Sequence, residues 1–435
     1  MVLRLEARDA GFATAFDAFL GSKRETSEDV DAAVAEIISD VRANGDEALI
    51  ALSQRFDDVD LGALGLRVRD DEIDAAAATI DAATHDALAL AHARIHAHHA
   101  RQMPSDDLYT DAAGATLGHR WTAVEAAGVY VPGGTASYPS SVLMNAVPAK
   151  VAGVPRIVMV VPSPRGELNP LVLAAARIAG VDEIYRVGGA QAVAALAYGT
   201  ATIAPVAKIT GPGNAYVAAA KRRVFGTVGI DMIAGPSEVL VIADRSARAD
   251  WVAADLLAQA EHDAVAQSIL ITDDRALADA VSSEVEAQLT RLPRANVAGA
   301  SWQNFGAIIK VDDVVRDAAA LADRIAAEHL EIATDNPRAI ADQIRNAGAI
   351  FLGHHTPEVI GDYVGGSNHV LPTARSARFS SGLGVLDFMK RTSLLSLTED
   401  ALSALGPAAM RLAEVEGLGG HRASVAIRIG DDTAG

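Results

Sequence analysis

Short, nearly continuous apolar segments rich in β-branched residues alternate with alanine-rich segments through the middle of the chain. Segments 127–131, 156–161 and 183–187 have the length and composition of buried strands, and 171–178 is typical of a helix. Strands that alternate with helices predict a parallel sheet covered on both faces. The sequence therefore favours an α/β fold.

The same alternation begins again further along the chain and predicts a second sheet. Its apolar segments are 238–243, 268–272, 306–311 and 349–352, and the two groups meet near 234–237. We therefore expect two tandem Rossmann-like parallel-sheet domains, with a helical N-terminal segment and a small C-terminal extension. The expected parts are an N-terminal segment 1–25, a helical region 26–123 that packs on the second α/β domain, a first α/β domain 124–236, a second α/β domain 237–375, and an extension 376–435.

The region before residue 125 is predicted to be mostly helical. Ser27, followed by two acidic residues, has the pattern of a helix N-cap, and apolar residues follow at helical spacing from Val34 to Val41. A second helix is expected from about 71 to 100, and it carries a histidine cluster between His92 and His99. These histidines share a helical face and could hold a metal, but a solvated polar face is favoured because no carboxylate joins them.

Composition narrows the function classes. The chain of 435 residues has 37 Lys+Arg against 56 Asp+Glu, a formal charge of −19, which disfavours binding to nucleic acid. It has no apolar run long enough for a membrane helix and no signal-peptide pattern near its first residue. It also has no cysteine, so nothing indicates disulfides or secretion. We therefore expect a cytoplasmic protein that does not act at a membrane.

Three glycine-containing loops follow predicted strands, at 131–135, 187–191 and 210–216. Glycines at the carboxyl end of a strand let the backbone approach a ligand, and a following helix N-terminus favours an anion such as a pyrophosphate. The third loop begins as Gly-x-Gly, but Tyr216 occupies the place of the third glycine. The dinucleotide motif is therefore incomplete, and ordinary turns between strands and helices would look similar.

Four histidines lie in separated segments, three of them beside a carboxylate or an amide. Their nitrogen and oxygen donors suit zinc, and a neighbouring Glu-His pair suits proton transfer. Each also has a plain structural explanation, such as a helix cap, a chance surface pair or a frayed tail. The segments are Gln259 with His262 on one face of a helix expected at 251–262, Glu328 with His329 at the end of a helix expected at 314–330, Asp362 with His369 in a glycine-rich loop, and Glu416 with His421 after a last helix expected at about 398–416.

Taken together and in chain order, these segments resemble the histidinol dehydrogenase family over nearly the whole chain. One motif could be a coincidence, but seven in sequence are very unlikely to be one. The most specific stretches are 131–134, 187–192, 211–215, 234–238, 259–262, 327–330 and 366–369.

The resemblance implies an NAD-dependent, four-electron oxidation of L-histidinol through L-histidinaldehyde to L-histidine, in the last steps of histidine biosynthesis. His329 would be the general base and Glu328 would activate water. The family is a homodimer with shared active sites and one zinc per subunit, and its C-terminal histidine reaches the partner's site. By motif, the zinc ligands would be Gln259, His262, Asp362 and His421, the NAD contacts Tyr130, Gln191 and Asn214, and the substrate contacts Ser237, Gln259, His262, His329, Asp362, His369, Glu416 and His421.

Three other functions are compatible with parts of this pattern. A zinc hydrolase would use the metal donors but leave the glycine loops without a role. A bilobed binding protein would explain the paired α/β units without turnover. A related zinc and NAD dehydrogenase could act on another amino or sulfonated alcohol. For any aldehyde oxidation, the absence of cysteine excludes a thiohemiacetal and leaves hydration by an activated water.

Overall fold

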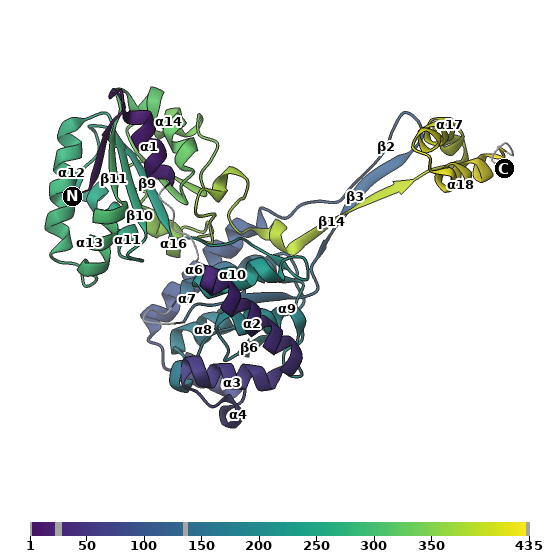
Figure 1. The fold of residues 1–435 in the computed structure, drawn as a ribbon, viewed down its shortest axis with the longest axis horizontal. Helices are drawn as coiled ribbons and strands as arrows, with labels where there is room; N and C mark the ends of the chain where they lie inside the picture. Colours follow the sequence, from purple (N-terminus) through teal and green to yellow (C-terminus); the bar gives the residue numbers. More distant parts are fainter. Residues whose placement is uncertain (1, 22–27, 134–137, 432–435) are drawn as a thin grey trace. The chain divides into compact units, whose positions relative to one another are not determined.

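The computed structural model describes residues 2–21, 28–133 and 138–431. The chain divides into two compact units, one formed by Met1–Gln102 with Glu125–Phe388 and the other by Met103–Val124 with Met389–Gly435. Figure 1 shows the helices and strands of each unit. The helix N-cap expected at Ser27 lies outside the described residues.

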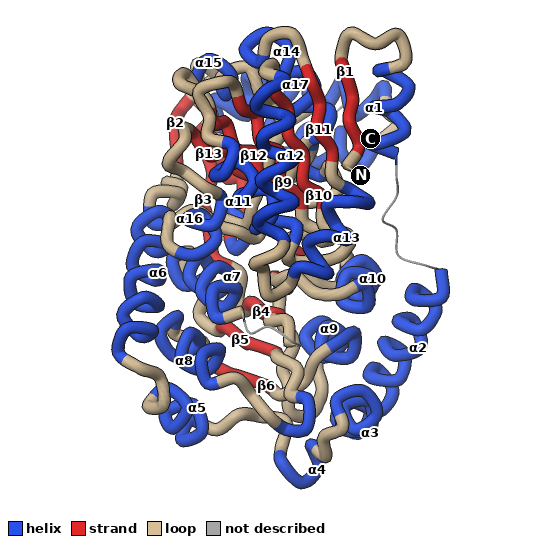
Figure 2. The backbone as a smooth tube through the Cα atoms, turned by 90° about the vertical axis from the view of Figure 1, so that its left-hand side faces the viewer, coloured by secondary structure: helices blue, strands red, loops and turns tan. Residues whose placement is uncertain are grey.

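The first unit holds two parallel sheets. One has the strand order β6-β5-β4-β7-β8, and all its neighbouring pairs are parallel. Figure 2 labels three of its strands, β4, β5 and β6. Every residue of β4 and β5 is buried, as expected for strands between two helical layers. The first predicted sheet is therefore confirmed. Its strands are β4 Ala127–Tyr130, β5 Ile157–Val160, β6 Glu183–Tyr185, β7 Lys208–Thr210 and β8 Gly229–Ile230.

The helices of the N-terminal region pack on this first sheet, whereas we expected them on the second. The apolar stripe of α2 (Glu28–Asn44), which includes Val34 and Val41, joins the core formed with α9 (Gly189–Tyr198) and α10 (Ala215–Val224). The alanine-rich faces of α9 and α10 allow this close approach. The other helices around this sheet are α3 Asp46–Asp57, α4 Leu61–Leu64, α5 Asp70–Ala77, α6 Ala82–Ala100, α7 Pro139–Val151 and α8 Pro170–Ala179.

The second sheet has the order β1-β11-β10-β9-β12-β13 and is also parallel. Its edge strand β1 comes from the N-terminal segment, which we had expected to be helical. The short alternation of Leu with Arg or Glu in this segment suits an edge strand. Its strands are β1 Leu3–Glu6, β9 Glu238–Ala243, β10 Gln267–Thr272, β11 Ala307–Lys310, β12 His329–Ala333 and β13 Ala349–Leu352; its helices are α1 Phe12–Gly21, α11 Ala249–Ala260, α12 Arg275–Leu289, α13 Ala295–Phe305, α14 Val314–Ile325, α15 Pro337–Ala341 and α16 Glu358–Tyr363.

The helix that we expected at 314–330 ends earlier than predicted. The helix α14 stops at Ile325 because Ala326 adopts a left-handed conformation, with φ 50°. His329 is the first residue of β12, which pairs with β9 on one side and β13 on the other. Glu328 and His329 therefore lie in a turn and at the start of a buried central strand, where their side chains are fixed by the sheet.

The expected helix 71–100 is two helices. It is interrupted after α5, and Asp81 caps the start of α6 by accepting the N–H of Thr84 at 2.9 Å. The histidine cluster lies on α6, where His96 is exposed but His99 is fully buried. His99 contacts the carbonyl oxygen of Ile95 at 2.7 Å, so it serves the packing of the helix and is not part of a solvated face.

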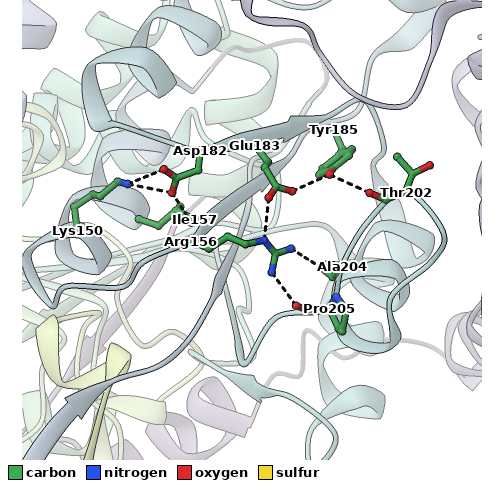
Figure 3. Close-up of polar contacts among 9 residues, drawn as sticks. All are labelled: Lys150, Arg156, Ile157, Asp182, Glu183, Tyr185, Thr202, Ala204 and Pro205. Atoms are coloured by element: carbon green, nitrogen blue, oxygen red, sulfur yellow. Dashed lines mark hydrogen bonds and ion pairs between the residues drawn. The ribbon is translucent and has the colours of Figure 1, made fainter.

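A polar network closes the edge of the first sheet beside β5 and β6 (Figure 3). Arg156 donates to Glu183 at 3.0 Å and to the carbonyl oxygens of Ala204 and Pro205. The hydroxyl of Tyr185 donates to Glu183 at 2.8 Å. These bonds tie the amino ends of β5 and β6 to the loop that leads into β7.

The second unit combines two strands that precede the first sheet with the end of the chain. In its sheet, β14 pairs antiparallel with β3, and β3 with β2. We had expected residues 103–123 to be helical and 376–435 to form the extension alone, but the strand pairing joins these two distant segments. The unit consists of β2 Asp107–Thr110, β3 Thr116–Ala123, β14 Met389–Ser396, α17 Glu399–Val415 and α18 Gly419–Ile429. Among the described helices of either unit, none is long and apolar enough to cross a membrane.

Candidate active site

A cavity of about 600 Å³ lies within the first unit, where the two sheets approach each other. The first sheet contributes residues at the carboxyl ends of its strands, including Pro132 after β4 and the loop that starts at Gly211 after β7. The second sheet contributes residues at the amino ends of its strands, including Ser237 before β9 and His329 at the start of β12. Only the first sheet therefore presents the strand ends at which α/β proteins usually bind nucleotides.

Glu328 is buried at the cavity wall with its side chain 8% exposed. Its carboxylate accepts the N–H of Glu238 at 3.0 Å and the hydroxyl of Ser237. Burial raises the pKa of Glu328 to about 7, although His329 and these hydrogen bonds act in the opposite direction. A carboxyl group with a pKa near neutrality is suited to accept a proton from water and to release it again.

His329 is surrounded by carboxylates. Its Nε2 lies 3.3 Å from Asp362 Oδ1, and its Nδ1 lies 3.8 Å from Glu328 and 3.7 Å from Glu358. Burial lowers the pKa of His329, but the three carboxylates outweigh this effect and raise the pKa to about 10. A cation bound by Asp362 would compete for that carboxylate and favour the neutral imidazole, which is the form that accepts protons.

Glu358 is a site residue that the sequence analysis missed. It begins α16, its side chain is 2% exposed, and burial raises its pKa to about 8. Its backbone N–H donates to the carboxylate of Glu331 at 2.6 Å, which fixes the start of the helix. The signal in the sequence was a carboxylate shortly after a core strand, although this pattern is common at turns.

Gln259, His262 and Asp362 provide donors of the kind that zinc binds. Gln259 is fully buried, and its Oε1 has no hydrogen-bond partner among the described residues. Burial lowers the pKa of His262 and so favours the neutral imidazole that a metal requires. Burial would raise the pKa of Asp362, but His329 outweighs it and the pKa is lowered. These residue types fit a zinc ion.

The metal donors in this cavity do not form a complete ligand set by themselves. In the part of the chain that the structure describes, no group of three His, Asp or Glu side chains could hold a metal. A metal here would therefore need the amide oxygen of Gln259 and a further donor. His369 supports the arrangement, since its Nδ1 lies 2.9 Å from the carbonyl oxygen of Asp362 and its Nε2 lies 3.4 Å from the Ser141 hydroxyl.

The glycine loops at the carboxyl end of the first sheet approach other backbone closely. Gly211 has φ 112°, and a Cβ there would lie 2.1 Å from the carbonyl oxygen of Tyr130, so no other residue fits. The hydroxyl of Tyr130 accepts the N–H of Gly189 at 3.0 Å. Asn214 caps α10 by accepting the N–H groups of Tyr216 and Val217. The loop after β7 thus presents Gly211, Gly213 and the N-terminus of α10 to the cavity, which fits a dinucleotide.

Most of the expected site residues meet at this cavity. Gln259 is buried beside the cavity residue His262, with 3.5 Å between its Nε2 and Nδ1 of the imidazole. Tyr130 and Gln191 are buried at the carboxyl end of the first sheet, and the cavity lining found for the described residues does not include them. The expected residues that line the cavity are Asn214, Ser237, His262, Glu328, His329, Asp362 and His369.

Two expected residues belong to the second unit. Glu416 is the C-cap of α17 and His421 lies in the first turn of α18. Both side chains are exposed. Their part in a site with the residues of the first unit stays a prediction.

Comparison with known proteins decides the family. The model of the histidinol dehydrogenase family matches residues 21–429. The chain belongs to the histidinol dehydrogenase family. The histidinol dehydrogenase of Rhizobium meliloti (strain 1021) is 67% identical over 429 residues, covering 99% of each chain. That of Agrobacterium fabrum (strain C58 / ATCC 33970) is 67% identical over 433 residues, covering 100% of each.

A solved structure extends this similarity to the fold. The histidinol dehydrogenase of Elizabethkingia anophelis superimposes with a TM-score of 0.93 at 36% identity, and 98% of each chain is covered. The resemblance seen in the sequence motifs and the predicted α/β fold are therefore both confirmed. The glycine-containing loops and the Glu328–His329 pair of this chain therefore lie in the fold that it shares with that histidinol dehydrogenase.

Proposed function

We propose that this chain oxidises L-histidinol through L-histidinaldehyde to L-histidine and transfers each hydride to NAD, in the last steps of histidine biosynthesis. One observation carries the proposal. A single cavity is bounded by the glycine loop of the first sheet and by the buried Glu328–His329 pair of the second. A hydride acceptor on one wall and a proton acceptor on the other is what an alcohol dehydrogenation needs.

The proposed ligands divide between the two walls. Asn214, Tyr130 and Gln191 would contact NAD. Gln259, His262 and Asp362 would hold one zinc per subunit, and His421 of the partner subunit would complete its ligand set. When bound, NAD supplies the acceptor for each hydride, and zinc supplies a Lewis acid for the substrate's amine and imidazole. Ser237, His369 and Glu416 of the partner subunit would complete the contacts with the substrate.

The residues of the chain handle the protons. In the first oxidation, His329 accepts the proton of the primary alcohol while a hydride leaves the same carbon, and the product is the aldehyde. Glu328 then takes a proton from water, and the oxygen of that water adds to the aldehyde carbon. His329 returns its proton to the aldehyde oxygen, which gives the hydrate and leaves the imidazole neutral again. In the second oxidation, His329 accepts a proton from the hydrate as the second hydride leaves, and the product is the carboxylic acid. Glu358 orients the imidazole from its Nδ1 side.

Water is the required nucleophile for the second oxidation. The chain contains no cysteine, so a covalent thiohemiacetal is excluded. Glu328 is the carboxylate suited to activate the water, because it lies at the cavity wall with a pKa raised to about 7. A zinc hydrolase would leave the glycine-lined wall of the cavity without a role.

A panel of amino and sulfonated alcohols, with NADH formation followed by absorbance, separates histidinol from related substrates.

We further propose that the active enzyme is a homodimer in which the C-terminal segment of each subunit completes the other's site. The second unit is small, and it exposes many large apolar side chains, which favours burial against another chain. The most exposed of these residues are Leu108, Tyr109, Leu395, Leu412, Val415 and Ile427.

Mixing two inactive variants tests the shared site. His421→Asn and Glu328→Gln homodimers should each form almost no L-histidine, and subunit exchange should restore L-histidine formation, since each heterodimer contains one site with both residues intact. We expect about a quarter of wild-type activity from an equimolar mixture at full exchange, as random pairing and one intact site per heterodimer require. Mass spectrometry of the mixture measures the exchange. Proven heterodimers without recovered activity would show that each site is built from one chain.

A further inference from the structure

A buried ion pair lies directly beside the glycine loop that follows β7. Lys221 on α10 and Asp231 after β8 form a salt bridge, and their side chains are only 2% and 1% exposed. Both residues contribute to the lining of the cavity. The catalytic scheme above gives neither of them a role.

The pair holds the polar groups of one residue, Gly211. The N–H of Gly211 donates to Asp231 Oδ2 at 2.8 Å, and its carbonyl oxygen accepts from Lys221 Nζ at 2.9 Å. The other carboxylate oxygen, Asp231 Oδ1, accepts the N–H of Met232 at 2.6 Å. Met232 directly follows Asp231 in the chain, so this bond holds the carboxylate in place beside the glycine loop.

Stability alone does not account for such a pair. Well-packed apolar side chains of similar size often replace a buried ion pair without loss of stability. The backbone of Gly211 does need partners, because this residue follows the last residue of β7 and has a φ of 112°, outside the regular conformation of a strand. Lys221 and Asp231 provide one partner each.

We propose that Lys221 and Asp231 are positioning residues that hold the Gly211 loop in the shape required to bind the dinucleotide. This inference rests on the proposed NAD dependence. The pair acts through the backbone of Gly211 and the adjoining Asn214, so it should affect the binding of the dinucleotide far more than the binding of histidinol.

The test compares Lys221→Met, Asp231→Asn and the double variant. Each single change leaves one partner without its counter-charge in a buried place, and such a variant can unfold. The double variant removes both charges together and keeps similar side-chain volumes. NADH binding is measured by fluorescence titration, KM is measured separately for NAD and histidinol, and thermal unfolding reports the fold.

We expect the double variant to fold and to bind NADH about tenfold more weakly, the effect of losing hydrogen bonds to charged groups. KM for NAD should rise by a similar factor, while KM for histidinol changes by less than about twofold. The matched control is Arg156→Met with Glu183→Gln. Arg156 likewise pairs with a carboxylate, at 3.0 Å, and donates to carbonyl oxygens, those of Ala204 and Pro205. It lies at the amino ends of the strands and is not part of the cavity lining.

Three outcomes would overturn the inference. A folded double variant that binds NADH as tightly as the wild type would remove the positioning role. An equal loss of NADH binding in the control pair would show a general effect of removing buried charge. Wild-type protein that binds no NADH would refute the proposed function first and this inference with it, so the two failures are distinguishable.

Discussion

Glu328→Gln should leave the first oxidation working and nearly stop the second. The amide keeps the size of the side chain but cannot take a proton from water, so the aldehyde is not hydrated at the site. General-base catalysis contributes about 10²–10⁴-fold, and we expect aldehyde oxidation to slow by that factor. The measurement supplies histidinol and histidinaldehyde in separate assays, follows NADH by absorbance, and traps any released aldehyde with a carbonyl reagent.

Glu358→Gln is the matched control for this experiment. Glu358 is buried like Glu328 and lies at nearly the same distance from Nδ1 of His329, 3.7 Å against 3.8 Å. Because it faces the imidazole that serves both oxidations, its loss should slow both steps to a similar degree. If Glu328→Gln also slowed both steps equally and no aldehyde accumulated, the assignment of Glu328 to water activation would be wrong.

Removal of zinc should abolish turnover, and added zinc should restore it. Without the metal the substrate loses the group that orients its amine and imidazole, and a misplaced reacting carbon costs about 10²-fold or more. Chelation followed by gel filtration prepares the metal-free protein, and inductively coupled plasma mass spectrometry measures the zinc content of the protein. Full activity of protein shown to contain less than a few per cent of one zinc per subunit would contradict the metal's role.

Zinc content also tests the ligands without any assay of activity. His262→Asn and Asp362→Asn should lower the zinc content below one per subunit, because each removes a donor at the cavity. His96→Asn is the control, since His96 is an exposed histidine on α6 beside His92. A loss of zinc from the His96 variant and not from the other two would show that the metal binds to the histidine cluster of α6.

The alternation of apolar strands and alanine-rich helices was sufficient to predict that the chain holds two parallel sheets, but it missed strands β1 and β12 of the second sheet. It could not predict the pairing of β1 with β11 or of β3 with β14, because such contacts join segments hundreds of residues apart. The helix predicted through Glu328 and His329 was wrong because its amphipathic pattern continues past Ile325. The left-handed turn at Ala326 ends the helix there without a glycine to mark it.

Most of the residues that the motifs selected lie at one cavity, since metal donors and bases need particular residue types that can be recognised in a sequence. Residues that act by positioning other residues have no such characteristic type or spacing. Glu358 and Asp231 are ordinary acidic residues near strand ends, and only the fold shows that one faces His329 and the other holds Gly211. Their roles depend on distances that the order of the sequence does not contain.

The number of NADH molecules formed for each histidinol tests the proposed four-electron oxidation. A limiting amount of L-histidinol is converted to completion by zinc-loaded protein with excess NAD, and NADH and L-histidine are both measured. We expect two NADH and one L-histidine for each histidinol consumed. One NADH with the aldehyde as the final product, or no NADH while another amino alcohol is oxidised, would contradict it.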